Sequence, residues 1–217
     1  AFGATLSERD AVLRQGGLTI TTTLDVQAQK AAQKAVNSHI PIDDPSGKAA
    51  AISMVRPGTG DVVAMAENRE WGISGAGKTT YNYNVERAMG GTIGMQAGST
   101  FKIFVLAAAM DAGISTTMKI KSPPSKVFSG FTNCTNGDVF PDYPVHNSTR
   151  SGIFNMREGT AYSVNTYFVQ LELLTGLCRP SEIASLLGVK TGNGDPLQVV
   201  PSFVLGANEV TPLMMAN

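Results

Sequence analysis

The amino-acid sequence predicts an α+β fold, in which an antiparallel sheet flanked by helices is joined to a mostly helical subdomain. Two apolar runs, 49–55 and 62–66, enclose an Arg-Pro-Gly-Thr-Gly-Asp turn, as in a β-hairpin. Residues 101–110 are almost entirely apolar, which is typical of a helix in the middle of a core. Three more segments have helical patterns: 155–162, 166–174 and 181–187.

The segment before the hairpin is predicted to be an appendage. Residues 18–24 alternate and are rich in β-branched side chains, which predicts a short strand. Asp25 is placed to cap a following helix, and the polar stretch 41–48 ends it. We therefore expect residues 1–48 to be a linker or appendage, and residues 49–217 to belong to the main domain.

After the hairpin, the segment 68–97 has little periodicity, so we expect a long loop there. Part of it matches the nucleotide-binding pattern G-x-x-x-x-G-K-[ST], at Gly72, Gly77, Lys78 and Thr79. Nucleotide binding needs an apolar strand leading into this loop and a helix leading out of it. Polar residues precede the pattern and poor helix formers follow it, so we do not expect a nucleotide site.

Composition argues against several further functions. The 217 residues have a formal net charge of zero and no Lys/Arg cluster, which argues against binding to nucleic acid or to a membrane surface. Neither His39 nor His146 has a second ligand at metal-binding spacing, so we expect no metal and no other cofactor. Cys134 and Cys178 are too far apart for a C-x-x-C motif, and the residues alone leave open one disulfide or two buried thiols.

A candidate catalytic pair opens the apolar helix, within the tetrapeptide Ser-Thr-Phe-Lys at residues 99–102. Residues three apart share one helix face, so the Lys102 amine can reach the Ser99 hydroxyl. A serine needs a base to become a nucleophile, and a lysine in apolar surroundings has a lowered pKa and can serve as that base. The alternative is a capping Ser99 and a Lys102 that extends to the surface. Lys102 is the only charged residue between Arg87 and Asp111, which favours the catalytic interpretation.

A second polar motif, Ser163-Val164-Asn165, falls between two predicted helices, where its side chains can point into a cleft or simply cap a helix. S-x-x-K together with such a triplet resembles penicillin-binding proteins and serine β-lactamases. The stretches GGLTITTTLDVQAQKAAQKAV, NVERAMGGTIGMQAGSTFK and SFVLGANEVTPLMMAN extend this similarity over nearly the whole chain. Together they resemble the linker and transpeptidase domain of class A (bifunctional) penicillin-binding proteins, with Ala97 in place of the usual Pro.

The resemblance implies a β-lactamase/transpeptidase-like fold, with the active site between the sheet and the helical subdomain. It also implies roles for four residues. Ser99 would be the acylated nucleophile and Lys102 its proton acceptor. Ser163 would relay a proton to the leaving amine, and Asn165 would hold Lys102 and the substrate backbone.

The implied activity is that of a serine D,D-transpeptidase, whose partners are peptidoglycan stem peptides and β-lactam antibiotics. The family works at the extracytoplasmic face of the bacterial cell membrane, with the anchor outside this chain. In that oxidising setting, a disulfide between Cys134 and Cys178 is expected. The alternatives are a D,D-carboxypeptidase or β-lactamase-type hydrolase, and a non-catalytic binding module. No Glu stands in an E-x-x-x-N arrangement that would activate water, which predicts slow deacylation.

Lys190-Thr191-Gly192 spells the third motif of the family, but we do not interpret it as that motif. It follows a predicted helix end and continues into an Asn-Gly-Asp-Pro turn, whereas the family motif lies on a strand. In the family the Val-Thr-Pro-Leu stretch comes before the motif, and here it comes after the triplet. We therefore expect residues 49–217 to be the N-terminal part of the domain, stopping before the later sheet strands. The remaining C-terminal part would be a partner chain or segment.

Overall fold

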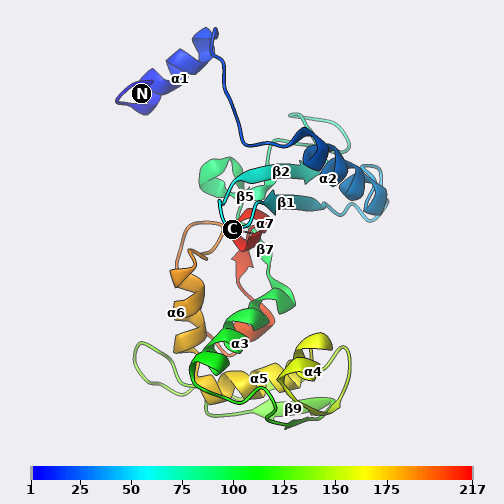
Figure 1. Ribbon diagram of the computed structural model, residues 1–217, viewed down its shortest axis with the longest axis vertical. Coiled ribbons are helices and arrows are strands. Elements are labelled where there is room, and N and C mark those ends of the chain that lie inside the picture. The colour runs from blue at the N-terminus through cyan, green and yellow to red at the C-terminus, as the bar shows by residue number, and fades with distance from the viewer. Residues whose placement is uncertain (1, 217) are drawn as a thin grey trace.

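The computed structural model describes residues 2–216 and confirms the α+β class. Figure 1 shows an elongated molecule. The hairpin of β1 (Ala51–Val55) and β2 (Val62–Glu67) and helix α2 (Val26–His39) lie toward one end, and the helices from α3 (Lys102–Asp111) to α6 (Cys178–Leu186) lie toward the other. The short helix α7 (Pro212–Ala216) returns the chain to the hairpin region, where it contacts strands β1 and β5 (Asn82–Glu86). Helices α3 to α6 form the helical half of the molecule. In sequence, this half lies between the hairpin and α7, which both belong to the sheet half.

The first part of the chain differs from the prediction. Helix α1 (Leu6–Gln15) was not predicted, although Thr5 and Glu8 form a capping box at its start. The strand predicted at 18–24 is wrong, because these residues are extended, exposed and not assigned to any strand. An alternating pattern forms a strand only where a neighbouring strand completes its backbone hydrogen bonds, and within residues 2–216 none pairs with this segment.

The predicted helix and hairpin are both present. Helix α2 (Val26–His39) starts at Asp25, whose carboxylate accepts hydrogen bonds from two amides of the first turn. Strands β1 (Ala51–Val55) and β2 (Val62–Glu67) pair antiparallel. The helix and hairpin share a small apolar core that includes Ala32, Val36, Ala64 and Ala66. Helix α2 thus packs on the sheet directly, while the division of the chain at residue 48 stays a prediction.

The segment 68–97 is not the irregular loop that was predicted. It contains short strands at Glu70–Trp71 (β3), Lys78–Thr79 (β4), Asn82–Glu86 (β5), Gly91–Thr92 (β6) and Met95–Gln96 (β7), and a 3₁₀ turn at Arg87–Met89 (η1). Most of these strands have only two residues, which is too few to show a period of two in the sequence. Thr79 ends a strand, the Lys78 amine pairs with the Glu70 carboxylate, and β5 follows in place of a helix. The nucleotide-like pattern therefore lacks the helix that a phosphate loop requires.

The helical half matches the predicted segments. Its helices are α3 (Lys102–Asp111), α4 (Met156–Ala161), α5 (Asn165–Thr175) and α6 (Cys178–Leu186), and Gly113 ends the turn after α3 with a φ of +71°. The small strand pairs between α3 and α4 were not predicted: β8 (Ile120–Ser122) with β11 (Gly152–Phe154), and β9 (Ser125–Phe128) with β10 (Tyr143–His146). Within residues 2–216, no helix combines the length and apolar character needed to cross a bilayer.

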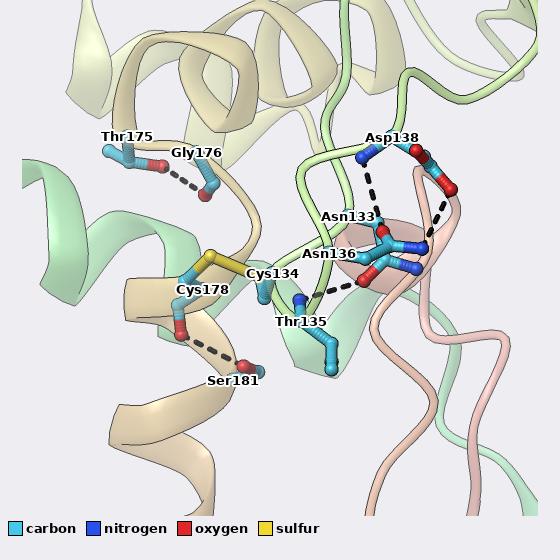
Figure 2. The surroundings of a disulfide bond; sticks show 9 residues. All are labelled: Asn133, Cys134, Thr135, Asn136, Asp138, Thr175, Gly176, Cys178 and Ser181. Atoms are coloured by element: carbon cyan, nitrogen blue, oxygen red, sulfur yellow. Dashed lines mark hydrogen bonds between the residues drawn. A yellow bond between two sulfur atoms is a disulfide. The ribbon is translucent and has the colours of Figure 1, made fainter.

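A disulfide joins Cys134 to Cys178, as the family resemblance implied. Figure 2 shows that it connects a loop beyond β9 to the first residue of α6. The loop forms a tight turn, in which the Asn133 side chain accepts a hydrogen bond from the Thr135 amide at 2.8 Å. The two cysteines are 44 residues apart, so the bond closes a long loop and restricts the unfolded chain.

The combined change Cys134→Ser and Cys178→Ser should lower the free energy of unfolding by about 4 kcal/mol, the chain-entropy value for a loop of this length. Urea unfolding of the oxidised protein and of the double variant measures the difference. Thiol titration of the denatured protein without reductant is the control. Two free thiols in that titration would contradict the disulfide.

Candidate active site

The centre of the site is the amine of Lys102, the first residue of α3, whose side chain is only 4% exposed. Its Nζ atom lies 3.1 Å from Ser99 Oγ, 3.0 Å from Ser163 Oγ and 2.8 Å from the Ser163 carbonyl oxygen. A fourth acceptor, Asn165 Oδ1, is 2.7 Å away. The structure therefore brings together all four site residues that the sequence predicted.

Burial lowers the pKa of Lys102 from 10.5 to about 8. The cause is loss of hydration, since the groups around the amine are hydroxyls, an amide and the Phe168 ring, whose centroid is 5.5 Å from Nζ. Among the described residues no carboxylate pairs with it. At pH 7 the shift costs about 3 kcal/mol of folding stability, and the cost is recovered as the pH rises from about 8 toward 10.5.

Two of the four acceptors orient the amine. The Asn165 side-chain nitrogen donates to the His146 carbonyl oxygen at 2.9 Å, which turns Oδ1 toward Lys102. This oxygen and the Ser163 carbonyl oxygen can only accept hydrogen bonds. A neutral amine has two N–H donors and one lone pair. When both donors are directed at these two oxygens, the lone pair faces the hydroxyl of Ser99 or Ser163.

Ser163 adopts a backbone conformation that serine rarely takes. Its φ of +49° makes it the one non-glycine residue with a positive φ in the described part of the chain. It occupies the position after α4 where glycine is usual, since its own amide bonds to the Thr160 carbonyl and the Val164 amide bonds to the Gly159 carbonyl, both at 3.0 Å. The turn directs both oxygens of Ser163 at Lys102. Such strain persists where the surrounding structure imposes it, often at functional sites.

Ser99 lies on the 3₁₀ turn η2 (Gly98–Phe101), immediately before the helix on which the sequence placed it. Backbone hydrogen bonds from residues 97 and 98 to residues 206 and 208 hold this turn in place. The site predicted from the sequence did not include residues 206 and 208. The Gly98 amide bonds to the Gly206 carbonyl at 3.2 Å, and a Cβ atom on Gly206 would overlap the Gly98 backbone. The Ala97 amide bonds to the Asn208 carbonyl at 3.0 Å. Gly206 and Asn208 belong to the SFVLGANEVTPL stretch, whose similarity to the family was the available signal.

An open cavity of about 180 Å³ borders the polar cluster. Its lining residues are polar Ser99, Thr100, Lys102, Thr160 and Ser163 and apolar Ile103, Leu106 and Phe168. A larger cavity of about 380 Å³, between β5 and α7, contains none of the four site residues. The smaller cavity is therefore the place where a substrate carbonyl could approach Ser99.

The triplet Lys190-Thr191-Gly192 lies away from this cavity. The Lys190 amine is 3.3 Å from the Glu86 carboxylate, and the Thr191 hydroxyl accepts from the Asp195 amide at 3.0 Å in a tight turn. The triplet is not part of a strand, which agrees with the prediction that it is not the third motif.

Comparison with known proteins identifies a family. A family model described as the penicillin binding protein transpeptidase domain matches residues 50–217. Penicillin-binding protein 1A of Mycobacterium tuberculosis is 30% identical over 164 residues, which cover 76% of this chain and 17% of that protein. Penicillin-binding protein 2D of Bacillus subtilis is 23% identical over 205 residues, covering 94% of this chain and 27% of that protein. The chain thus spans a small part of these curated relatives.

Solved structures of penicillin-binding proteins also match this chain. The structure of the penicillin-binding protein PonA1 from M. tuberculosis matches with a TM-score of 0.65 and 27% identity, covering 94% of this chain and 50% of that one. An imipenem acyl-enzyme complex of penicillin-binding protein A from M. tuberculosis matches with a TM-score of 0.60 and 21% identity, covering 89% and 49% of the two chains. The second similarity establishes the fold alone.

The strain at Ser163 is testable by two substitutions that both remove the hydroxyl. Ser163→Gly should be about 1 kcal/mol more stable than Ser163→Ala, because only glycine adopts a positive φ without steric cost. Thermal or urea unfolding of the two variants side by side measures the difference. Equal stability, or a more stable alanine variant, would mean that the left-handed turn is not formed in solution.

Proposed function

This chain belongs to the penicillin-binding protein transpeptidase family, and from that premise we propose that it contributes the nucleophile of a class A serine D,D-transpeptidase. The observation that carries the proposal is the buried Lys102 amine, which lies within hydrogen-bond distance of Ser99, Ser163 and Asn165. A desolvated lysine between two hydroxyls, beside an open cavity, is equipped for proton transfer. An ordinary surface lysine has none of these features.

In the acylation step, neutral Lys102 takes the proton of the Ser99 hydroxyl across the 3.1 Å contact. The Ser99 oxygen attacks the carbonyl carbon of the penultimate D-alanine of a stem peptide, and the bond to the terminal D-alanine nitrogen breaks. The leaving nitrogen needs a proton. Ser163 Oγ, 3.0 Å from the Lys102 amine, relays that proton from Lys102 to the nitrogen, so the base returns to its neutral form.

In the second step, the amine of a neighbouring stem peptide attacks the ester on Ser99, and the serine regains its proton as the cross-link forms. Asn165 acts through position, since its Oδ1 holds the amine of Lys102 at 2.7 Å while its nitrogen is held by the His146 carbonyl. A β-lactam acylates Ser99 through the same first step, but its leaving nitrogen stays attached to the acyl group and blocks the second step.

We place residues 49–217 in the N-terminal part of the transpeptidase domain and residues 1–48 in a linker before it. The similarity to class A penicillin-binding proteins supports a site of action for this chain at the extracytoplasmic face of the bacterial cell membrane. Its partners there would be peptidoglycan stem peptides and β-lactam antibiotics.

A transferase is favoured over a hydrolase by the groups around the ester. Hydrolysis needs a base that activates water beside the acyl group. Within residues 2–216, no carboxylate hydrogen-bonds to Ser99, Lys102, Ser163 or Asn165. Glu158, the nearest glutamate in sequence to Ser163, is occupied in the capping box of α4. The acyl-enzyme should therefore be long-lived.

Intact-mass spectrometry after exposure to benzylpenicillin tests the proposal. The chain, together with the C-terminal part of its domain, should gain one covalent adduct that peptide mapping places on Ser99, and Ser99→Ala in the same setting should gain none. Thr100→Ala is the matched control, because it removes the adjacent hydroxyl and should leave the adduct in place. An adduct that persists in Ser99→Ala would refute the assignment of the nucleophile, and rapid turnover of nitrocefin would favour the hydrolase.

A further inference from the structure

A buried carboxyl group outside the proposed proton-transfer set caps the segment that supports Ser99. Glu172, on α5, is fully buried, and its Oε1 accepts a hydrogen bond from the Val204 amide at 3.0 Å. Val204 lies in the 3₁₀ turn η3 (Phe203–Leu205), is also fully buried, and has no other acceptor for its amide in the described part of the chain. Glu172 thus supplies the single partner of a backbone donor that water does not reach.

The turn η3 is the support of the turn that carries Ser99. The Phe203 ring packs on the Phe101 ring with 5.2 Å between centroids, and both side chains are fully buried. At the end of η3, the Gly206 carbonyl accepts the Gly98 amide, and no room remains for a side chain between the two backbones. A displacement of η3 would therefore be transmitted directly to η2.

Helix α5 also carries the other side of the site. Asn165 is its first residue, and Phe168, one turn later, packs against the Lys102 amine. Glu172 follows one further turn along the same helix, so one rigid element contacts both the base and the support of the nucleophile. We propose that Glu172 is a positioning residue for acylation, which holds the Ser99 turn in register with Lys102 and Asn165. This inference rests on the proposed transpeptidase function.

The hydrogen bond requires an acceptor oxygen at the Glu172 position, not a negative charge. Burial raises the pKa of Glu172 well above its ordinary value, so the carboxyl group favours its protonated form. Its second oxygen, Oε2, has no hydrogen-bond partner among the described residues, and no cation pairs with it. Glutamine therefore reproduces the shape and the acceptor, whereas aspartate keeps the acid but is one methylene too short.

The test measures acylation by a fluorescent penicillin of the chain together with the C-terminal part of its domain, with the acylation rate constant separated from the binding constant. Glu172→Met keeps the approximate volume and removes the acceptor. It should slow acylation roughly 10- to 100-fold, as expected for a misplaced nucleophile, with the binding constant little changed. Glu172→Asp should also be slow, and Glu172→Gln should lie close to the wild type.

Three measurements separate positioning from loss of folded protein. The final stoichiometry of labelling should still approach one per chain in Glu172→Met, since folded molecules react slowly but completely. Val36→Ala, a core truncation between α2 and the sheet, is the control for lowered stability and should acylate at the wild-type rate. Faster acylation of Glu172→Gln than of Glu172→Asp supports a hydrogen-bond role. Faster acylation of Glu172→Asp would overturn that role, because the negative charge would then be the property that matters.

Wild-type acylation rates in Glu172→Met, or a Gln variant as slow as the Met variant, would also overturn the proposal. If the methionine variant fails to fold, the comparison of the Gln and Asp variants decides the question. Failure of the proposed function is distinguishable, because the wild-type chain would then form no adduct even with the C-terminal part of its domain present.

Discussion

The desolvated amine of Lys102 is the interaction on which the rest of the site depends. A lysine that is 4% exposed and has no carboxylate partner among the described residues is costly to keep protonated, and its pKa falls to about 8. The fold tolerates this cost because four oxygens surround the amine. They stabilise it in either protonation state, and two of them direct its lone pair at a hydroxyl. The same burial that lowers stability at pH 7 would produce the base of the proposed mechanism.

Each contact with the amine is held in place by a different part of the chain. The His146 carbonyl, at the end of β10, fixes the Asn165 amide. The turn after α4 forces Ser163 into a left-handed conformation that aims both of its oxygens at Lys102. The η3 segment supports the Ser99 turn through Gly206. Outside the site, the disulfide ties the loop beyond β9 to α6. The geometry is therefore a property of the packed helical half, and no single motif contains it.

Sequence reasoning identified the features of the fold and the site that local sequence patterns encode. The S-x-x-K spacing, the apolar α3 and the β1–β2 hairpin follow from periodicity and turn chemistry, and the pairing of the Ser163 motif with Ser99 followed from resemblance to a family. The strand expected at 18–24 failed because alternation cannot supply a neighbouring strand. The two-residue strands within 68–97 carry too little pattern to detect. Gly206 and Glu172 act through contacts between residues distant in sequence, which one sequence does not reveal.

The pH dependence of acylation by benzylpenicillin tests the role of Lys102 most directly. If neutral Lys102 is the base, the acylation rate constant should rise about tenfold per pH unit from pH 6 and level off near the pKa of about 8. The protonated amine cannot accept the Ser99 proton, which sets the direction of the change. A rate constant that is flat between pH 6 and 9, or that still rises steeply above pH 9, would contradict the account. A flat profile would mean that no group titrating near pH 8 limits acylation. A continued rise would mean that the base stays protonated to a higher pH than the burial of Lys102 predicts.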